Sequence, residues 1–199
     1  MFKELFYPRQ AVLVTAASSE KANVTAVEWV MPVCEKPPML ALSLHNTSLT
    51  LDLLSTSMEF VVAVPGERLR DAVLLCGATS GKFIDKFSEA SLTQVKARRV
   101  SAPLILEAAA NIECRMLSLT SAGDHTLVVG EVVEVGLSKE NREFAPLIFG
   151  AAERMAGQGQ QGNPPDRQQE KAPDRLAEKS SGGPQEKAPE KQQERNGKP

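Results

Sequence analysis

Residues 111–138 read NIECRMLSLTSAGDHTLVVGEVVEVGLS, and this stretch predicts two long β-strands joined by a tight turn. Apolar residues recur with the two-residue period of a strand in both halves, 111–119 and 125–138. Between the halves, residues 121–124 (SAGD) include the glycine and aspartate that tight turns favour. The stretch is therefore a predicted antiparallel hairpin, around which the rest of the fold is interpreted.

Two details of this hairpin predict its shape. The first strand has one apolar face, formed by Ile112, Cys114 and Met116. The apolar residues then change phase at Leu117 and Leu119, which predicts a β-bulge. In the second strand, Gly130 marks a bend or a close backbone approach, because glycine has no side chain to pack.

Shorter strands precede the hairpin. Their predicted ranges are 11–17 (AVLVTAA), 23–30 (NVTAVEWV), 38–45 (PMLALSLH) and 59–65 (EFVVAVP). Strands and helices do not alternate regularly along the chain, which disfavours a parallel Rossmann sheet. We expect a mainly β fold, a β-barrel with a few short helices, because a closed barrel leaves no long exposed strand edges.

Only short helices fit between these strands. Residues 50–57 begin with Thr50, a predicted N-terminal cap. Residues 66–77 form a second predicted helix that ends at Gly77. Its predicted buried face consists of Leu69, Val73 and Cys76. One or two further helical turns are predicted over residues 81–90.

The composition of the chain changes near Ala156. Residues 1–155 contain the Val, Leu, Ile and Ala that a core needs, and they form one predicted domain. Residues 156–199 are rich in Gln, Pro, Lys and Glu instead. Such a segment buries too little apolar surface to offset the entropy cost of ordering it, so we expect a disordered charged tail.

The totals restrict partners and location. A net charge of -2 without a basic face argues against nucleic acid as a partner. The sequence lacks the apolar run that a membrane span requires, and its first 15 residues, MFKELFYPRQAVLVT, lack the apolar core of a secretion signal. We therefore expect a cytoplasmic protein with no membrane contact.

The cysteines and histidines predict no metal site. The three cysteines are Cys34, Cys76 and Cys114, and they lie far apart in the sequence. We expect them to be buried, reduced thiols. The two histidines, His45 and His125, do not have the spacing of metal ligands, and no serine lies in a G-x-S-x-G hydrolase motif.

The stretch GATSGKF, residues 77–83, resembles a phosphate loop with a piece missing. Only three residues separate its glycines, and Phe83 follows Lys82 where a nucleotide loop has Ser or Thr. A second lysine, Lys86, follows four residues after the first. The stretch is a degraded nucleotide loop, a plain helix start or a phosphate site of another kind.

Three polar segments are candidate ligand sites. One predicted helix start carries Asn46, Thr47, Ser48 and Thr50, and a second carries Ser80, Gly81, Lys82 and Lys86. Free N–H groups and the helix dipole at such starts favour a phosphate. The third segment comprises Asn23, Thr25 and Glu28, which lead to Trp29, the only tryptophan. Each segment also has a purely structural interpretation, as helix caps, a solvated lysine face and core or interface packing respectively.

The order of four motifs along the chain is more specific than any one of them. The motifs are NVTAVEWVMPVCEKPPMLALSL, TSLTLDLLSTSMEFVVAVP, SGKFIDKF and GDHTLVVGEVVEV. In this order they resemble the flavin reductase-like, FMN-binding split-barrel family over about residues 8–150, and the flavoredoxin branch in particular. The resemblance implies a six-stranded Greek-key split barrel, a homodimer, and FMN held near the dimer interface.

The resemblance also implies which residues bind the cofactor. Along the flavin ring they are Asn23, Thr25, Ala26, Val27, Glu28 and Trp29. Near the ribityl phosphate they are Asn46, Thr47, Ser48 and Thr50, and in the SG…DKF motif they are Ser80, Gly81, Lys82, Lys86 and Phe87. His125 matches a histidine on the nicotinamide or flavin side of the pocket, with an ordinary turn histidine as the alternative. GATSGKF is then interpreted as a phosphate-proximal site for a flavin.

The favoured function is FMN-dependent oxidoreduction, in which the flavin carries the chemistry and the protein binds and tunes it. Electrons pass from a reduced donor, NAD(P)H or a redox partner protein, to flavin or a downstream acceptor. Three classes stay open: an NAD(P)H:flavin reductase, an electron-transfer flavoprotein, and a split-barrel binding module without redox turnover. The sequence has no Rossmann G-x-G-x-x-G motif, so it does not identify the donor.

Overall fold

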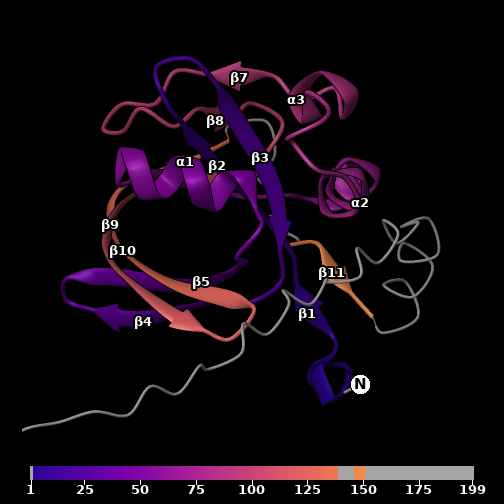
Figure 1. Ribbon diagram of the computed structural model, residues 1–199. Coiled ribbons are helices and arrows are strands. Elements are labelled where there is room, and N and C mark those ends of the chain that lie inside the picture. The colour runs from indigo at the N-terminus through magenta and orange to yellow at the C-terminus, as the bar shows by residue number, and fades with distance from the viewer. Residues whose placement is uncertain (1, 139–145, 151–199) are drawn as a thin grey trace, which may run out of the picture. The chain divides into compact units, whose positions relative to one another are not determined.

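A computed structural model describes residues 2–138 and 146–150, and these form a mainly β domain (Figure 1). The predicted tail, 156–199, and the end of the predicted domain at 155 lie outside the described residues. No helix within the described part of the chain is long and apolar enough to cross a membrane.

Seven antiparallel strands form the main sheet, in the order β3-β2-β6-β9-β10-β5-β4. Their bounds are β2 Val12–Ala17, β3 Ala22–Val27, β4 Val30–Glu35, β5 Pro38–His45, β6 Glu59–Val64, β9 Ala110–Ala122 and β10 His125–Leu137. Two small ladders flank it, β1 (Arg9–Gln10) with β11 (Ile148–Phe149) and β7 (Gln94–Val95) with β8 (Leu104–Ile105). Helical segments are short: 3₁₀ turns at Phe2–Phe6 and Glu67–Leu69, α1 Leu49–Ser57, α2 Arg70–Ala78 and α3 Lys86–Glu89.

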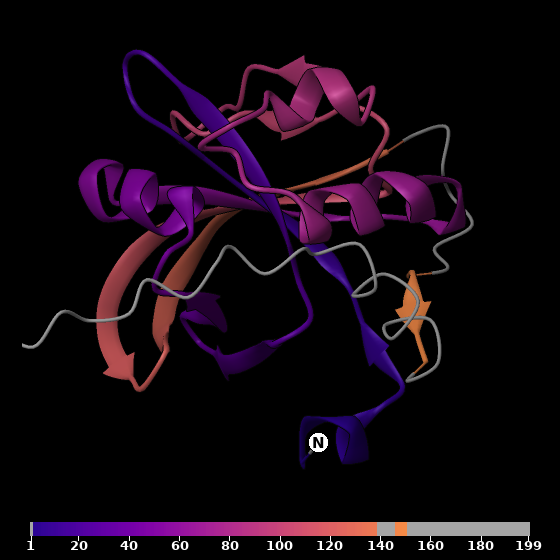
Figure 2. The same ribbon diagram turned by 45° about the vertical axis from the view of Figure 1, so that its right-hand side comes forward.

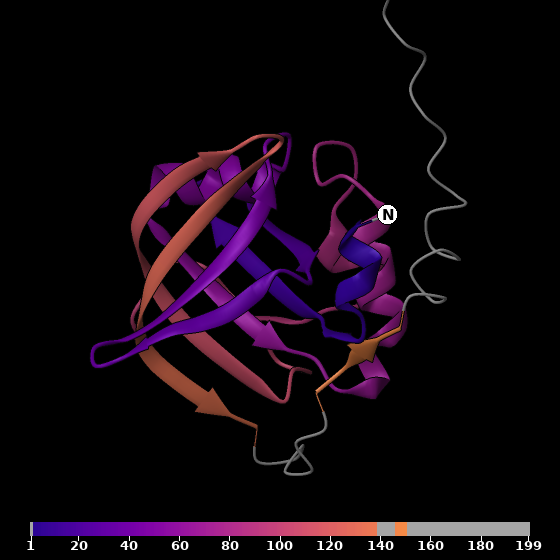
Figure 3. The ribbon, with the colours of Figure 1, turned by 90° about the horizontal axis from the view of Figure 1, so that it is seen from below.

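The sheet curls into a barrel that is split between its two edge strands. β3 and β4 follow each other in the chain but occupy opposite edges of the sheet. The chain crosses from one edge to the other at Glu28–Trp29, where the backbone N–H of Ser43 donates to the carbonyl of Trp29 at 2.9 Å. Figure 3 shows the strands curving around a common interior. The expected β-barrel is confirmed.

The crossing at Glu28–Trp29 shortens the predicted strand 23–30. It also gives the main sheet a different number of strands from the number that the resemblance implies. The predicted strand 23–30 ends at Val27, because the backbone leaves the β3 ladder there to reach the other edge. The family resemblance implies six strands, whereas the main sheet has seven in the part of the chain described. The extra strand arises because residues 22–35 are divided at Glu28–Trp29.

The long hairpin and its bulge are confirmed. Val129 lies opposite Ser118 and Gly130 lies opposite Met116, so Leu117 is the extra residue of the bulge. The turn is shorter than predicted, because only Gly123 and Asp124 separate the strands. Gly123 has a φ of 69°, a left-handed conformation that glycine adopts without steric cost.

Two buried clusters form the core. The first lies within the barrel and includes Val14, Leu42, Phe60 and Val128. The second lies between the barrel and the α2–α3 region and includes Leu13, Val73, Cys76, Phe87 and Ile105. Because β2 is covered from both sides, all six of its residues are buried. Figure 2 shows α1 and α2 on opposite sides of β3, which both helices contact.

Three predictions about helix ends are wrong. Ser48, not Thr50, occupies the N-cap of α1, because Thr50 lies inside the first turn with its side chain fully buried. α2 runs to Ala78, so Gly77 lies in its last turn instead of ending it. α3 begins only at Lys86, since the Asp85 carboxylate accepts from the N–H groups of Phe87 and Ser88 and starts the helix there.

Gly130 is expected to be intolerant of any side chain. A Cβ on Gly130 would lie 2.5 Å from Cζ of Phe60, whose ring is fully buried. Overpacking of a well-filled core typically costs about 1–3 kcal/mol, so Gly130→Ala should lower the free energy of unfolding by that amount. Urea denaturation measures it. Gly136→Ala in the same strand is the matched control, because its Cβ would approach no atom closer than 3.9 Å. Equal losses for the two variants would contradict the prediction.

Candidate functional site

A cavity of about 510 Å³ opens at the split of the barrel. It is bounded by β3, the end of β5, the start of α1, the segment from the end of α2 to α3, and the β9–β10 turn. It includes these predicted site residues: Asn23, Thr25, Ala26, Val27, Glu28, Trp29, Thr47, Ser48, Ser80, Gly81, Lys86 and His125. Segments more than a hundred positions apart thus meet at one cavity, which explains why single motifs carried little information.

Four predicted site residues do not line the cavity. Asn46 donates to the carbonyl of Gly123 at 2.9 Å and accepts from Thr126, so it ties the end of β5 to the β9–β10 hairpin. Phe87 is buried in the second core cluster. Thr50 accepts a hydrogen bond from the lining residue Asn23, and Lys82 is exposed and pairs with Asp52, which is not a lining residue either.

One end of the cavity is lined with hydroxyl groups from two elements. Thr47 and Ser48 lie at the start of α1, and Thr79 and Ser80 follow the end of α2. The side chain of Ser48 makes no capping hydrogen bond. The first N–H groups of an α-helix have no partner within the helix, and the helix dipole makes this end attractive to an anion.

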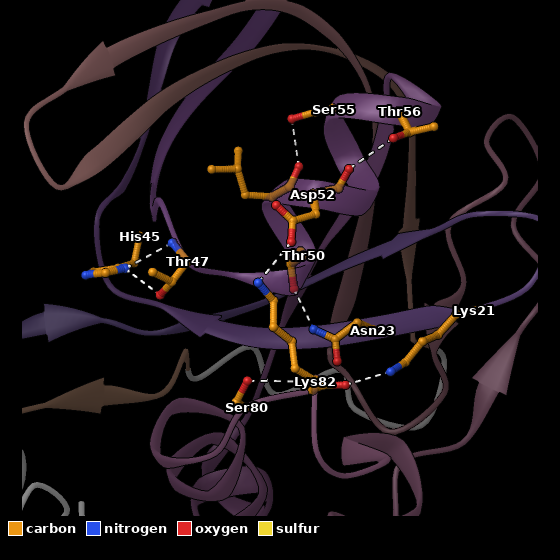
Figure 4. Close-up of polar contacts among 12 residues, drawn as sticks. Lys21, Asn23, His45, Thr47, Thr50, Asp52, Ser55, Thr56, Ser80 and Lys82 are labelled. Atoms are coloured by element: carbon orange, nitrogen blue, oxygen red, sulfur yellow. Dashed lines mark hydrogen bonds and ion pairs between the residues drawn. The ribbon is translucent and has the colours of Figure 1, made fainter. Parts of the chain in front are cut away.

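A buried junction holds this end together (Figure 4). The side chain Nδ2 of Asn23 donates to Oγ1 of Thr50 at 2.9 Å, and both side chains are buried. Gly81 rests against the same amide, because a Cβ on Gly81 would lie 2.0 Å from Oδ1 of Asn23. Asn23 therefore links β3, the first turn of α1 and the segment after α2. The absence of a side chain at Gly81 permits that contact.

The two lysines of GATSGKF and its continuation have different environments. Lys86 is only 3% exposed, and its Nζ donates to the carbonyl of Cys76 at 2.7 Å. Desolvation lowers the pKa of Lys86, because burial penalises the charged ammonium. Lys82 is exposed and pairs with Asp52 of α1 at 3.2 Å (Figure 4). The solvated-face interpretation is thus wrong for Lys86 and describes Lys82.

Aromatic rings also gather in the wall of the cavity. The rings of Trp29 and His125 have centroids 4.7 Å apart, and the ring of His45 lies edge-on to His125 at 5.1 Å. Trp29 is 36% exposed, so it is not core packing. The hydroxyl of Tyr7, the only tyrosine in the chain, donates to the carboxylate of Glu28 at 2.9 Å.

The two histidine rings are held by different partners. Nδ1 of His125 lies 2.7 Å from the Asp124 carboxylate, and this hydrogen bond lowers the pKa of Asp124. Because a carboxylate only accepts, His125 carries its proton on Nδ1. Nδ1 of His45 instead accepts the backbone N–H of Thr47 at 3.2 Å, so neutral His45 carries its proton on Nε2. In their neutral forms, His125 is an acceptor at Nε2 and His45 is a donor there.

Several lining residues were not predicted. They are Lys3, Tyr7, Ser43, Leu44, His45, Leu49, Gly77, Thr79 and Asp124. Thr79 and Gly77 lie one and three positions before Ser80 within GATSGKF, and His45 adjoins the predicted hydroxyl cluster, so including the whole stretch and one more residue of the cluster would have found them. Lys3 and Tyr7 had no such signal, because the N-terminal segment reaches the cavity only through the tertiary fold.

The cavity has the size and the chemistry for a flavin mononucleotide. Small-molecule sites typically measure roughly 300–1,000 Å³, and this one lies within that range. β3 is an edge strand of the main sheet, so its outward backbone groups have no strand partner there and can pair with a polar ring edge. The hydroxyl groups and the buried Lys86 in the same cavity suit a phosphate.

The thiols differ in exposure, and this gives a test of the fold around the cavity. Cys76 and Cys114 are buried as predicted, whereas Cys34 on edge strand β4 is partly exposed. Burial raises the pKa of Cys76 to about 11 and that of Cys114 to about 12. We expect maleimide at pH 8 to modify Cys34 first in the native protein, with the other two reacting only on unfolding, as followed by mass spectrometry.

The same pKa values predict a pH dependence of stability. A thiol with a raised native pKa stabilises the native state below its ordinary pKa, near 9, and loses that contribution as the pH rises further. The contribution of these two thiols to the free energy of unfolding should therefore fall between about pH 9 and 12. For the maleimide labelling at pH 8 described above, Cys34→Ser is the control, and no cysteine of this variant should be modified rapidly in the native protein. Rapid labelling of Cys76 or Cys114 in that variant would contradict the burial described here.

Comparison with known proteins gives consistent matches. The family model described as flavin reductase like domain matches residues 4–157. An uncharacterized protein of Archaeoglobus fulgidus is 38% identical over 132 residues, 66% of this chain and 74% of that protein. The NADH:riboflavin 5'-phosphate oxidoreductase of Streptomyces pristinaespiralis is 30% identical over 132 residues, 66% of this chain and 72% of its own length. The flavoredoxin structure from Methanosarcina acetivorans is 25% identical with a TM-score of 0.67, covering 72% of this chain and 81% of that one. The range 4–157 contains all four motifs quoted above.

Proposed function

Because the chain belongs to the flavin reductase-like family, we propose that it is an FMN-dependent oxidoreductase with FMN bound in the cavity at the split of the barrel. The observation that carries the proposal is the polarity of this cavity. Hydroxyls and a buried lysine line it together with edge-strand backbone and aromatic rings. This combination suits a ligand that carries both a phosphate and a planar ring.

The proposed roles of the residues follow from their positions. Thr47, Ser48 and Ser80 would donate to the phosphate, and Lys86 would supply the positive charge. The backbone of residues 25–28 would pair with the pyrimidine edge of the ring, where N–H donors stabilise negative charge on a reduced ring. Bound FMN supplies the hydride or single-electron chemistry itself.

Trp29 and His125 would face the second substrate. Trp29 would shield one edge of the ring site from water, since it lines the cavity and its indole ring packs against the ring of His125. The Asp124 carboxylate holds the proton of His125 on Nδ1, which leaves Nε2 free to accept a hydrogen bond from a donor amide. We infer NAD(P)H as the donor, because the relative from Streptomyces pristinaespiralis is an NADH:riboflavin 5'-phosphate oxidoreductase.

An electron-transfer flavoprotein is the second candidate, and the fold similarity to a flavoredoxin favours it. The absorption spectrum of the purified protein, with FMN added if needed, tests flavin binding. NADH or NADPH oxidation with FMN present then separates the reductase from the electron carrier. A protein that binds no flavin would overturn the proposal, and one that binds flavin without accepting electrons from any donor would be a binding module.

We also propose that the protein is a homodimer. An apolar groove of about 360 Å³ lies on the outer face of β4, β5 and β10 and includes Phe6, Trp29, Met31 and Leu127. Trp29 lines both this groove and the flavin cavity, so a second copy seated in the groove would also shield the ring end. Light scattering should give twice the mass of one chain for the wild type. For Met31→Glu it should give the mass of a single chain. A monomer at micromolar concentration with FMN bound would overturn the dimer.

The cytoplasmic location expected from the sequence is part of this proposal. Its support is that all three cysteines are free thiols, which suits a reducing compartment.

A further inference from the structure

Lys21 lies outside the cavity, in the turn between β2 and β3, yet it contacts the cavity wall. Its Nζ donates to the carbonyl oxygen of Gly81 at 2.7 Å, across 60 positions of sequence (Figure 4). Figure 4 shows the Lys21 side chain reaching from β3 toward the segment that carries Ser80 and Lys82. None of the four motifs explains this contact.

The contact fixes the orientation of a peptide group. The carbonyl of Gly81 points to Lys21, and the N–H of Lys82 on the same peptide plane lies 3.3 Å from Oγ of Ser80. A peptide group is planar, so its C=O and N–H turn together. Without a donor at Lys21, the Gly81–Lys82 peptide would lose the bond that holds its oxygen there. A carbonyl oxygen turned toward the cavity would repel an anionic ligand.

Gly81 depends on such a restraint more than most residues would. It has no side chain to anchor it, and its Cα rests directly on the buried Asn23 amide. Glycine also has a wider range of backbone conformations than other residues. Asn23 therefore limits how close the segment comes to β3, while Lys21 determines which way its peptide faces.

We propose that Lys21 is a positioning residue for the anionic end of the cavity, acting through the Gly81 carbonyl on the orientation of the segment 79–82. The proposal rests on the proposed function, since it assigns the flavin phosphate to this end. It differs from the role of Lys86, because Lys21 does not line the cavity. The ligand class it affects is the phosphate monoester, and not the flavin ring.

The test compares FMN with riboflavin, which has the same ring but no phosphate. In Lys21→Met, the FMN affinity should fall about tenfold, as expected for a hydrogen bond from a charged donor, while the riboflavin affinity stays within about twofold. Lys21→Arg keeps a charged donor and should recover most of the FMN affinity. Lys36→Met is the matched control, because Lys36 lies exposed in the β4–β5 turn and does not line the cavity. Flavin fluorescence quenching measures all of these affinities.

The outcomes separate the two proposals. A wild-type protein that binds neither flavin would overturn the proposed function itself. If the wild type binds FMN, then unchanged FMN affinity in Lys21→Met would overturn the positioning role. Equal losses for FMN and riboflavin would also overturn it, because a general loosening of the cavity wall affects both ligands. A similar loss of FMN affinity in Lys36→Met would show that the effect comes from the net charge of the protein. That result would also overturn the positioning role of Lys21.

Discussion

Replacing Lys86 with methionine should weaken FMN binding by roughly tenfold to a hundredfold. A charge-assisted hydrogen bond to phosphate is typically worth about 1.5–3 kcal/mol, and Lys86 is the only buried cation that lines the cavity among the described residues. Methionine keeps an unbranched apolar stem of similar length, so it fills the same space without the charge. Titration of apoprotein with FMN, followed by flavin fluorescence, measures the change.

The methionine variant should keep its stability. The pKa of Lys86 is lowered from its ordinary value of 10.5, so burying its charged form costs folding free energy, and this cost disappears as the pH rises toward 10.5. Methionine removes the cost together with the hydrogen bond to Cys76. Alanine would be a poorer choice, because it would leave a cavity as well.

Lys82→Met is the matched control for Lys86→Met. The two lysines are four residues apart, but Lys82 is exposed and its ion pair with Asp52 is of the kind that contributes at most about 1 kcal/mol. We expect Lys82→Met to leave the FMN affinity within about twofold. If Lys82→Met weakened FMN binding as much as Lys86→Met, the assignment of the buried lysine would be wrong.

The different environments of Lys82 and Lys86 show how far the sequence could predict the site. Both lysines were predicted as site residues because they follow a predicted helix start, and their spacing of four allowed one solvated helix face as the alternative. The structure separates them because the Asp85 carboxylate caps a new helix immediately before Lys86, which leaves Lys82 in a turn. The sequence predicted a site in this segment, and Ser80, Gly81 and Lys86 of it line the cavity, but which lysine is buried depended on the packing of α3 against β3.

The fold was more predictable than the site, for a related reason. The period-two pattern of the long hairpin, its bulge at Leu117 and the close approach at Gly130 are local features, and each was read from adjacent residues. The break at Glu28–Trp29 was not predicted, because the alternating pattern continues across it. That break depends on the closure of the barrel, where the chain passes from one sheet edge to the other.

Residues that reach the cavity only through tertiary packing left no signal in the sequence. Tyr7 contacts Glu28 across 21 positions, from a segment with no motif. Asn46, by contrast, belongs to a polar cluster that looks like a ligand site, but its side chain holds the β9–β10 hairpin. Polar residues next to a helix start thus divide between binding and structural roles according to which way each side chain points.

Gly81→Ala should strongly reduce both stability and flavin binding. The new Cβ would lie 2.0 Å from Oδ1 and 2.6 Å from Cγ of Asn23, distances at which one of the two must move. Asn23 cannot easily turn away, because it is buried and bound to Thr50. Overpacking of this kind costs about 1–3 kcal/mol of unfolding free energy, measured by urea denaturation. A displaced segment would also carry Ser80 away from its place in the cavity wall, so FMN affinity should fall at least tenfold if each displaced hydrogen bond is worth about 1.5 kcal/mol.

A double-mutant cycle with Asn23→Ala tests whether this contact is the cause. Asn23→Ala alone leaves the buried Thr50 hydroxyl without its partner, which should cost about 1–3 kcal/mol. In Gly81→Ala/Asn23→Ala the colliding amide is gone, so the second substitution should add little to the first. The two losses should therefore be less than additive, with a coupling of about 1 kcal/mol or more. Simple additivity would mean that the contact between Gly81 and Asn23 is not the cause of the loss.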